Sequence, residues 1–261
     1  MTIVVKIGGA ALEQPDVVEQ VAQSIAALGK DGHRVAIVHG GGAALSRTLL
    51  RMGCQSQFVR GLRVTDAETR DVALMVLAGQ MNKQLVAGLG KAGQIALGLC
   101  GGDLGLFRAH KQCGKGTEDL GFVGDICTVE QRWLEMMWAN GVVPVIASIA
   151  LGMDGEYYNV NADQMATACA IACRAQALVF LTDVPGVKDG DGAVIRWLDV
   201  RNIAAMVENA TVSGGMLPKL EACTRAKRHG IERVRIMPAS SAELLPGVFT
   251  QRIDSGTEVM Q

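Results

Sequence analysis

The stretch Tyr158-Asn159-Val160-Asn161-Ala162-Asp163 stands directly before a long segment of small, mostly apolar residues, 164–174. Asp163 lies at or just inside the expected start of this helix, where a carboxylate complements the positive helix end. The apolar run that follows, residues 177–181, is typical of a buried parallel strand, and it ends in Thr182-Asp183-Val184-Pro185-Gly186-Val187. Ligands bind at the carboxyl ends of such strands in open α/β sheets. On this stretch alone, Asp163 is either a helix cap or part of a ligand site.

Composition excludes several classes of function. The 261 residues are 49% hydrophobic but only 4% aromatic, which indicates an aliphatic core of the kind that doubly covered strands need. A net charge of −1 does not favour nucleic acid or an anionic membrane. The seven cysteines are scattered, with no signal peptide and no metal-binding spacing, so we expect no disulfide framework and no protein metal site. Apolar runs such as 142–152 are too short to span a bilayer, so a soluble cytoplasmic protein is expected.

Glycines follow the first two predicted strands. Residues 2–7 are followed by Gly8-Gly9, and residues 34–39 by Gly40-Gly41-Gly42. The glycine triplet 40–42 opens a predicted helix, and the glycine pair 8–9 stands shortly before one. Both therefore resemble anion-binding turns at helix N-termini. Lys6 interrupts an otherwise apolar central strand, which is unfavourable unless the ammonium group is paired or reaches solvent at the strand end.

Alternating strands and helices predict a three-layer αβα sandwich with a mostly parallel central sheet. Residues 100–125 are glycine-rich and polar, and their short alternating pieces predict β-hairpins on the substrate side. No linker-like composition interrupts the chain. We therefore expect a single domain over 1–261, with an N-terminal lobe of roughly 1–160 and a C-terminal lobe of roughly 161–261 that meet near Asp163.

Six short motifs follow one another along the chain. They are Lys6-Ile7-Gly8-Gly9, His39-Gly40-Gly41-Gly42, Gly61-Leu62-Arg63-Val64-Thr65, Asn159-Val160-Asn161-Ala162-Asp163, Thr182-Asp183-Val184-Pro185-Gly186-Val187 and Gly214-Gly215-Met216-Leu217-Pro218-Lys219. Each is weak alone, but in this order the set resembles the amino acid kinase family, in the branch that phosphorylates N-acetyl-L-glutamate. The Gly-Leu-Arg-Val-Thr segment separates this branch from relatives that phosphorylate aspartate, carbamate or nucleotides.

The resemblance implies transfer of the γ-phosphoryl group of ATP, with Mg²⁺ carried by the nucleotide, to the side-chain carboxylate of N-acetyl-L-glutamate in arginine biosynthesis. It implies that Lys6 and Lys219 flank the transferring group and that Asp163 holds both lysines. The resemblance also implies a substrate-binding set and a nucleotide-binding set. The first is Gly41, Gly42, Arg63 (on the α-carboxylate), Asn159 and Asn161 (on the acetamido side), and the second is Gly8, Gly9, Thr182, Asp183, Gly214 and Gly215.

The residue types agree with this chemistry independently. A carboxylate nucleophile, with a reference pKa of roughly 4, is already ionised at neutral pH, so no general base is needed. None of the four histidines stands in a convincing catalytic context, and a structural role is favoured for His39 beside its glycines. Phosphoryl transfer needs positive charge and positioning, which two lysines and glycine turns supply. An arginine matches a substrate carboxylate through a two-pronged contact.

Other functions remain compatible with the sequence. A related kinase acting on a carrier-protein-linked amino acid would favour a basic docking surface, and a fosfomycin- or isopentenyl-phosphate-type kinase would not need Arg63. A non-catalytic ligand-binding regulator would not need the two lysines, and ATP turnover would exclude it. A dehydrogenase is disfavoured, because the match Gly88-Leu89-Gly90-Lys91-Ala92-Gly93 closes a helix and does not follow a strand.

The resemblance also bears on assembly. Family members that arginine inhibits carry an additional N-terminal helix that links dimers into a hexameric ring. Only Met1 precedes the first predicted strand, residues 2–7. We therefore expect a homodimer that arginine does not inhibit.

Overall fold

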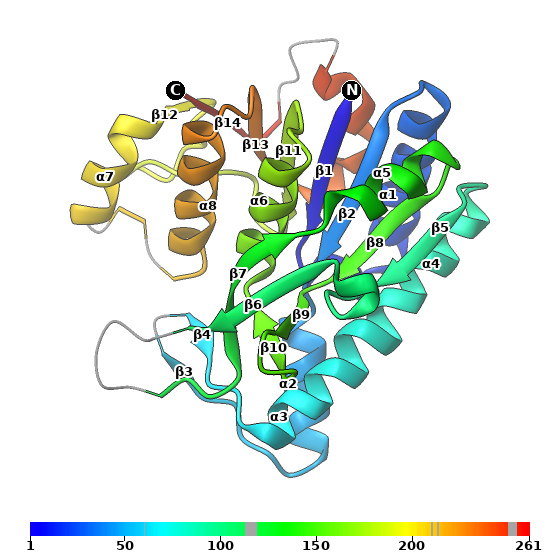
Figure 1. Cartoon of the computed structure of the whole chain (residues 1–261). Helices are drawn as coiled ribbons and strands as arrows, with labels where there is room; N and C mark the ends of the chain where they lie inside the picture. The colour runs from blue at the N-terminus through cyan, green and yellow to red at the C-terminus, as the bar shows by residue number, and fades with distance from the viewer. Residues whose placement is uncertain (60, 113–118, 210, 213, 250–254) are drawn as a thin grey trace.

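An eight-stranded sheet crosses the molecule (Figure 1). The computed structural model describes residues 1–59, 61–112, 119–209, 211–212, 214–249 and 255–261. The strand order is β12-β14-β13-β11-β1-β2-β8-β5. The bounds are β1 Thr2–Ile7, β2 Arg34–His39, β5 Ala96–Leu99, β8 Val143–Ala147, β11 Ala177–Thr182, β12 Trp197–Asp199, β13 Arg233–Pro238 and β14 Thr257–Met260. All neighbours are parallel except β13 and β14, so β12 and β14 run opposite to the other six strands.

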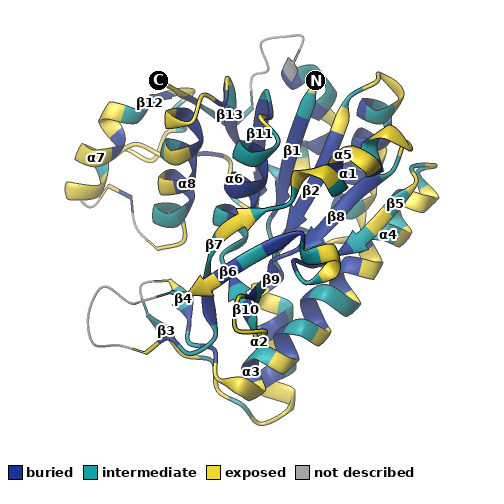
Figure 2. Cartoon of the chain, viewed as in Figure 1, coloured by how far each residue is buried: buried dark blue, intermediate teal, exposed yellow. Residues whose placement is uncertain are grey.

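Helices cover both faces of this sheet, which confirms the three-layer prediction. Along β1, Val4 packs on one face with helices α5, α6 and α8, whereas Ile3 and Val5 pack on the other with α1, α4 and the C-terminal η4 segment. The alternation follows from the two-residue period of a strand. Figure 2 shows that β1, β2 and β8 are buried along most of their length. The helical bounds are η1 Ala11–Glu13, α1 Pro15–Lys30, α2 Gly42–Arg51, α5 Gln131–Ala139, α6 Ala162–Ala172, α7 Val200–Glu208, α8 Met216–Arg228 and η4 Ala239–Phe249.

One long helix runs beneath α2 and then along the sheet. It consists of α3 (Ala67–Ala73), a π-helical segment η2 (Leu74–Met81) and α4 (Asn82–Lys91). By length and composition alone this 25-residue helix could cross a membrane, with a mean hydropathy of 1.2 in its most apolar window. Nearly half of that window, 44%, is buried inside the protein, as in a core helix that packs against its own domain.

A second, smaller set of strands lies at the carboxyl ends of the main sheet. Strands β6, β7, β9 and β10 close into a four-stranded barrel, and β3 and β4 form an antiparallel pair beside it. The bounds are β3 Phe58–Val59, β4 Leu62–Arg63, η3 Asp103–Gly105, β6 Phe107–Lys111, β7 Val123–Val129, β9 Ile149–Gly152 and β10 Tyr157–Val160. Strands β6 and β7 are antiparallel, as the hairpin prediction required, although residues 113–118 between them lie outside the described part of the chain.

Candidate active site

Lys6, Asp163 and Lys219 meet at the carboxyl end of the central sheet. The Lys6 Nζ lies 2.8 Å from Asp163 Oδ1, and the Lys219 Nζ lies 3.1 Å from each of the two carboxylate oxygens. Lys6 is in β1 on the face that carries Val4, which is the face covered by α6 and α8, the helices of the other two residues. The sheet register and two helix N-termini therefore bring together residues that are up to 213 positions apart in sequence, since 219 − 6 = 213.

The three side chains form a buried charge cluster. Lys6 is 8% exposed, Asp163 6% and Lys219 5%. Burial lowers the pKa of Lys6, and the Asp163 carboxylate opposes that effect. Burial would raise the pKa of Asp163, but the two ammonium groups together outweigh it and hold that pKa below its usual range. One positive charge therefore remains without a carboxylate partner within the cluster, so the site is suited to an anionic ligand.

The structure separates the two interpretations of Asp163. Asn161 is the N-cap of α6, where its Oδ1 accepts hydrogen bonds from the backbone N–H groups of Asp163 and Gln164 at 2.9 and 3.1 Å. Asp163 is the second residue of the helix, and its carboxylate faces the two lysines. The helix-cap interpretation of Asp163 is therefore wrong, because Asn161 caps the helix.

Two glycine turns lie back to back beside this cluster. A Cβ atom on Gly9 would lie only 2.9 Å from the Cα of Gly41, so no larger residue fits at this crossing without movement. Gly41 is the N-cap of α2, whose first turn begins at Gly42. The first N–H groups of a helix have no partner within it, and they form an anion-binding terminus. On the other side, Gly8 donates its N–H to Leu181 O at 2.8 Å, next to the end of β11.

Arg63 lines a cavity that it shares with Lys6 and Asp163. Its guanidinium group donates to Gly42 O at 3.0 Å, to Ser46 Oγ at 2.7 Å and to Ser56 Oγ, and it stacks 4.6 Å from the Phe58 ring centre. The residue is 7% exposed, its guanidinium group contacts no carboxylate within the described part of the chain, and burial lowers its pKa. A guanidinium group that is fixed in this way, with N–H groups to spare, is ready to bind a carboxylate.

The two predicted asparagines line the cavity between Arg63 and the lysine cluster. Asn159 donates its Nδ2 to Thr65 Oγ1 at 3.3 Å. Asn161 uses its side-chain oxygen as the α6 cap, which leaves its amide NH₂ as the group that can face a ligand. Together these residues bound a cavity of about 220 Å³ that also includes Lys6 and Asp163.

Among the predicted nucleotide residues, Gly9 lines the same cavity as Arg63 and Lys6, whereas Gly8, Thr182, Asp183, Gly214 and Gly215 do not. Thr182 ends β11 and donates its hydroxyl to Asp183 Oδ1 at 3.1 Å. Gly214 has a φ of +59°, which favours glycine, and Gly215 is the N-cap of α8, four residues before Lys219. A second cavity of about 190 Å³ adjoins these groups in sequence, and it is lined by Val184, Gly186, Val187, Lys188, Thr211, Val212 and Met216.

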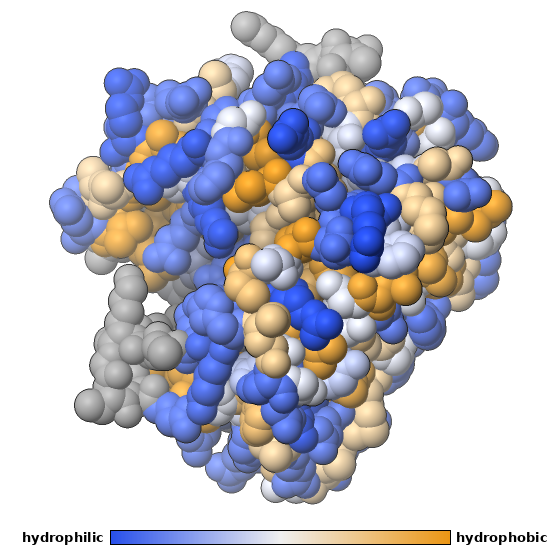
Figure 3. All heavy atoms as spheres, in the orientation of Figure 1, coloured by the Kyte–Doolittle hydropathy of each residue, from blue (hydrophilic) through white to orange (hydrophobic). Residues whose placement is uncertain are grey.

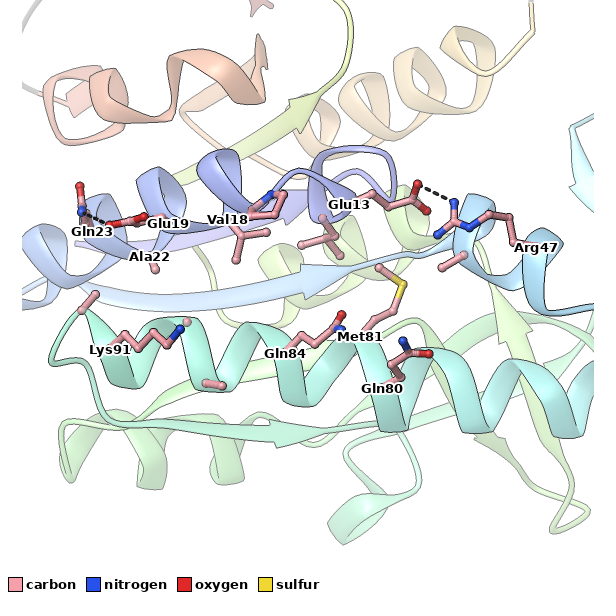
Figure 4. Close-up of a pocket in the computed structure, with 16 residues that line it drawn as sticks. Glu13, Val18, Glu19, Ala22, Gln23, Arg47, Gln80, Met81, Gln84 and Lys91 are labelled. Atoms are coloured by element: carbon pink, nitrogen blue, oxygen red, sulfur yellow. Dashed lines mark hydrogen bonds and ion pairs between the residues drawn. The ribbon is translucent and has the colours of Figure 1, made fainter.

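A larger cavity, of about 770 Å³, lies away from this chemistry. It is a groove between α1 and the segment from Gln80 to Ala92, with the Arg47–Glu13 ion pair at one end and Lys91 at the other (Figure 4). The groove contains none of the predicted site residues. Size alone therefore does not choose between the cavities, and the buried charge cluster makes the smaller cavity the candidate active site.

Several residues of the site were not predicted from sequence. Phe180 lies beneath Lys219, with its ring centre 5.5 Å from Nζ. Ser46 and Ser56 fix the guanidinium group of Arg63. These contacts connect distant segments through side chains of common types, so the sequence carries no local signal for them.

Comparisons with known proteins agree with this geometry. A model of the amino acid kinase family matches residues 1–238. The structure of smu.665 from Streptococcus mutans UA159 superimposes with a TM-score of 0.83 at 28% identity, covering 99% of this chain and 98% of that one. The chain belongs to the amino acid kinase family.

Within that family its similarity to acetylglutamate kinases extends over the whole chain. The acetylglutamate kinase of Acidobacterium capsulatum is 59% identical over 260 residues, covering 100% of this chain and 99% of the relative. That of Koribacter versatilis is 57% identical with the same coverage. The family resemblance deduced from the six motifs is thereby confirmed.

Proposed function

We propose that this protein transfers the γ-phosphoryl group of ATP to the side-chain carboxylate of N-acetyl-L-glutamate, and that the resulting acyl phosphate serves arginine biosynthesis. The observation that carries the proposal is the Lys6–Asp163–Lys219 cluster, which shares one side of the molecule with Arg63 and its cavity. The similarity to acetylglutamate kinases over the full chain supports the choice of substrate.

The reaction follows from these groups. A side-chain carboxylate oxygen attacks the γ-phosphorus, the bond to the bridging oxygen of ADP breaks, and no proton has to be removed from the nucleophile. Lys6 and Lys219 stabilise the negative charge on the transferring group, and Asp163 holds the two ammonium groups at 2.8 and 3.1 Å in position. The N–H groups of Gly9 and the start of α2 hold the phosphoryl group and substrate in line, whereas the N–H group of Gly8 is already bonded to Leu181 O.

Mg²⁺ enters this proposal with the nucleotide. Among the described residues, no group of three or more His, Cys, Asp or Glu side chains could hold a metal ion. A polyphosphate supplies the oxygen ligands that Mg²⁺ prefers, and the two lysines and glycine N–H groups fit such a polyphosphate. Mg²⁺ bound to the nucleotide would neutralise part of the negative charge of the polyphosphate.

The two sides of the lysine cluster suggest a division of labour. Arg63 would bind the substrate's α-carboxylate, with Asn159 and Asn161 on the acetamido side. Thr182 and Asp183, with Gly214 and Gly215, would line the nucleotide site, because they adjoin in sequence the cavity bounded by Val184 and Met216. We propose that 1–261 is one domain in which roughly 1–160 serves the substrate and the phosphates and roughly 161–261 the nucleotide. The six described cysteines are free, which supports a cytoplasmic location.

A homodimer is also part of the proposal. Strand β5 is at the edge of the sheet, and Ile95 and Leu97 beside its free edge are 68% and 44% exposed. Hydrophobic atoms gather on that side of the molecule (Figure 3). An exposed, apolar edge strand is a template for pairing with a second chain. Light scattering should show a dimer that Leu97→Lys weakens, and a monomeric wild-type protein would contradict the proposal.

A substrate panel tests the proposed function. ATP and hydroxylamine are supplied with N-acetyl-L-glutamate, glutamate, aspartate or N-acetylaspartate, and the hydroxamate formed from the acyl phosphate is measured. We expect N-acetyl-L-glutamate to be preferred, because Arg63 and the asparagines together address both its α-carboxylate and its acetamido group. A clear preference for unacetylated glutamate would overturn the proposal.

A further inference from the structure

A buried hydrogen-bond relay ends beneath the glycine turn of α2. His39 and Asn82 are both 0% exposed. Asn82 donates its Nδ2 to Val145 O at 2.9 Å and lies 3.1 Å from His39 Nε2, and His39 Nδ1 lies 3.0 Å from Gly40 O. The chain of contacts therefore runs from strand β8 through the first residue of α4 to the carbonyl group that precedes Gly41.

The direction of each hydrogen bond is determined by the backbone. Asn82 faces two carbonyl oxygens, Val145 O and, at 3.4 Å, Leu99 O, so its NH₂ group and not its oxygen must point there. The same NH₂ then donates to His39 Nε2, which has to be the unprotonated ring nitrogen. The ring proton consequently resides on Nδ1 and donates to Gly40 O. Burial lowers the pKa of His39 to about 4, so the ring is neutral near pH 7 and this tautomer persists.

The π-helical segment brings a second group of atoms to the same turn. A Cβ on Gly41 would lie 2.5 Å from Leu77 Cδ2 and 2.5 Å from Met81 Sδ, both of which belong to η2. A π-helical turn holds an extra residue, so it rotates the following α4 relative to α3, and such segments occur at functional sites. Here the segment ends at Met81, directly before Asn82. Three groups therefore contact the turn Gly40–Gly42: His39 of the relay bonds to Gly40 O, and both η2 and Gly9 lie against Gly41.

We propose that His39 and Asn82 are positioning residues for phosphoryl transfer, which act through Gly40 on the orientation of the backbone N–H groups at the start of α2. This inference rests on the proposed function, because the N–H groups matter only if a phosphoryl group or substrate is held there. The position of this turn also affects Arg63, because the guanidinium group of Arg63 donates a hydrogen bond to Gly42 O. Neither residue touches the reacting atoms.

A double-mutant cycle in the full-length protein tests the proposal. His39→Phe and Asn82→Leu each break the relay with side chains of similar shape. We expect each to lower kcat about 10-fold, the effect of roughly one hydrogen bond, while both KM values stay within about threefold. The double variant should lower kcat no further, because the relay is already broken. Its melting temperature should exceed that of the less stable single variant, since replacing both partners leaves fewer polar groups unsatisfied.

A matched control removes a comparable buried hydrogen bond at the other end of the same strand. Trp138 donates its Nε1 to Val35 O at 2.8 Å in β2, so Trp138→Phe should destabilise the protein without changing kcat. The positioning role is refuted if kcat is unchanged in the single variants, or if the double variant recovers kcat together with its melting temperature. A wild-type protein without turnover of N-acetyl-L-glutamate would instead refute the proposed function.

The tautomer of His39 supplies a readout that needs neither substrate nor a folded variant. In ¹⁵N NMR spectra of the wild-type protein, we expect His39 to carry its proton on Nδ1 and to remain neutral at pH 6. A proton on Nε2 would overturn the relay, whatever the kinetic result.

Discussion

Replacing Asp163 with asparagine removes the carboxylate that pairs with both Lys6 and Lys219. All three residues are at most 8% exposed, so the lysines cannot turn freely into water once the negative charge is gone. The N-cap of α6 is not affected, because Asn161 provides it. The change therefore acts on stability through the lost charge and not through the helix end.

The magnitude follows from the geometry. Removing one partner of a buried ion pair destabilises a protein by about 3–5 kcal/mol. Asparagine keeps one oxygen that can still accept a hydrogen bond from one lysine, so we take the lower value, about 3 kcal/mol. At roughly 2–4 °C per kcal/mol for a chain of this size, the melting temperature should fall by about 6–12 °C.

The loss should also depend on pH. The folded-state pKa of Lys6 is lowered by burial, so the unfolded state binds more protons between that pKa and about 10.4, and stability rises with pH in that window. Without Asp163 the folded-state pKa falls further, and the window extends to lower pH. The difference in unfolding free energy between wild type and Asp163→Asn should therefore shrink as pH rises from the Lys6 pKa of the folded variant to that of the folded wild type, and stay constant above it.

Urea denaturation of both proteins at several pH values measures this difference, and steady-state kinetics measures turnover in parallel. Thr167→Val is unsuitable as a control because its hydroxyl donates to Asp163 O, whereas Lys227→Met removes a distant lysine bonded to Glu232 O. A loss below about 1 kcal/mol, or a difference that does not change with pH, would refute the reasoning about the buried cluster.

Three further predictions concern single residues. Lys6→Ala and Lys219→Ala should each lower kcat about 10²–10³-fold in steady-state assays, by analogy with the loss of a group that stabilises transition-state charge; a change confined to KM would speak against this role. Arg63→Ala should mainly raise KM for the amino acid, and Arg63→Lys should restore little, because lysine lacks the two-pronged fork; an unchanged KM would contradict the assigned contact. Because the folded-state pKa of His39 is about 4 and its unfolded value is about 6.5, its contribution to stability should be lost as pH falls through that range, up to about 3 kcal/mol, and denaturation of His39→Phe should show a flatter pH dependence; equal slopes would argue against it.

The central sheet could be predicted because its strands carry local signals. Residues 2–7 and 34–39 were delimited correctly, since each is an apolar run that stops at glycines. The strand pairs β3–β4 and β12–β14 were not predicted: they are two to four residues long and are fixed by partners far along the chain. Closure of the hairpin region into a barrel was missed for the same reason, because the paired residues of β6 and β9 are 43 positions apart in sequence (151 − 108 = 43).

The charged residues of the candidate site could be named from the sequence, whereas the residues that hold them in position could not. A lysine within the apolar strand of residues 2–7 requires a partner, which made Lys6 visible from sequence. The roles of Asn161 and Asp163 could not be separated, because both residue types cap helices and only the orientation of the side chains distinguishes them. The π-helical turn at 74–81 has the composition of an ordinary apolar helix, so neither it nor the contact of Asn82 with His39 could be foreseen.

The most direct test of the account follows an oxygen atom. N-acetyl-L-glutamate labelled with ¹⁸O in both side-chain carboxylate oxygens is incubated with ATP and the enzyme, and hydroxylamine then attacks the carbonyl carbon of the acyl phosphate and releases inorganic phosphate. If the carboxylate is the nucleophile, the bridging oxygen remains with phosphorus, and mass spectrometry should find one ¹⁸O atom in each phosphate. Phosphate without ¹⁸O would show that the enzyme only hydrolyses ATP, and would contradict the assignment of Lys6, Asp163 and Lys219 to acyl-phosphate formation.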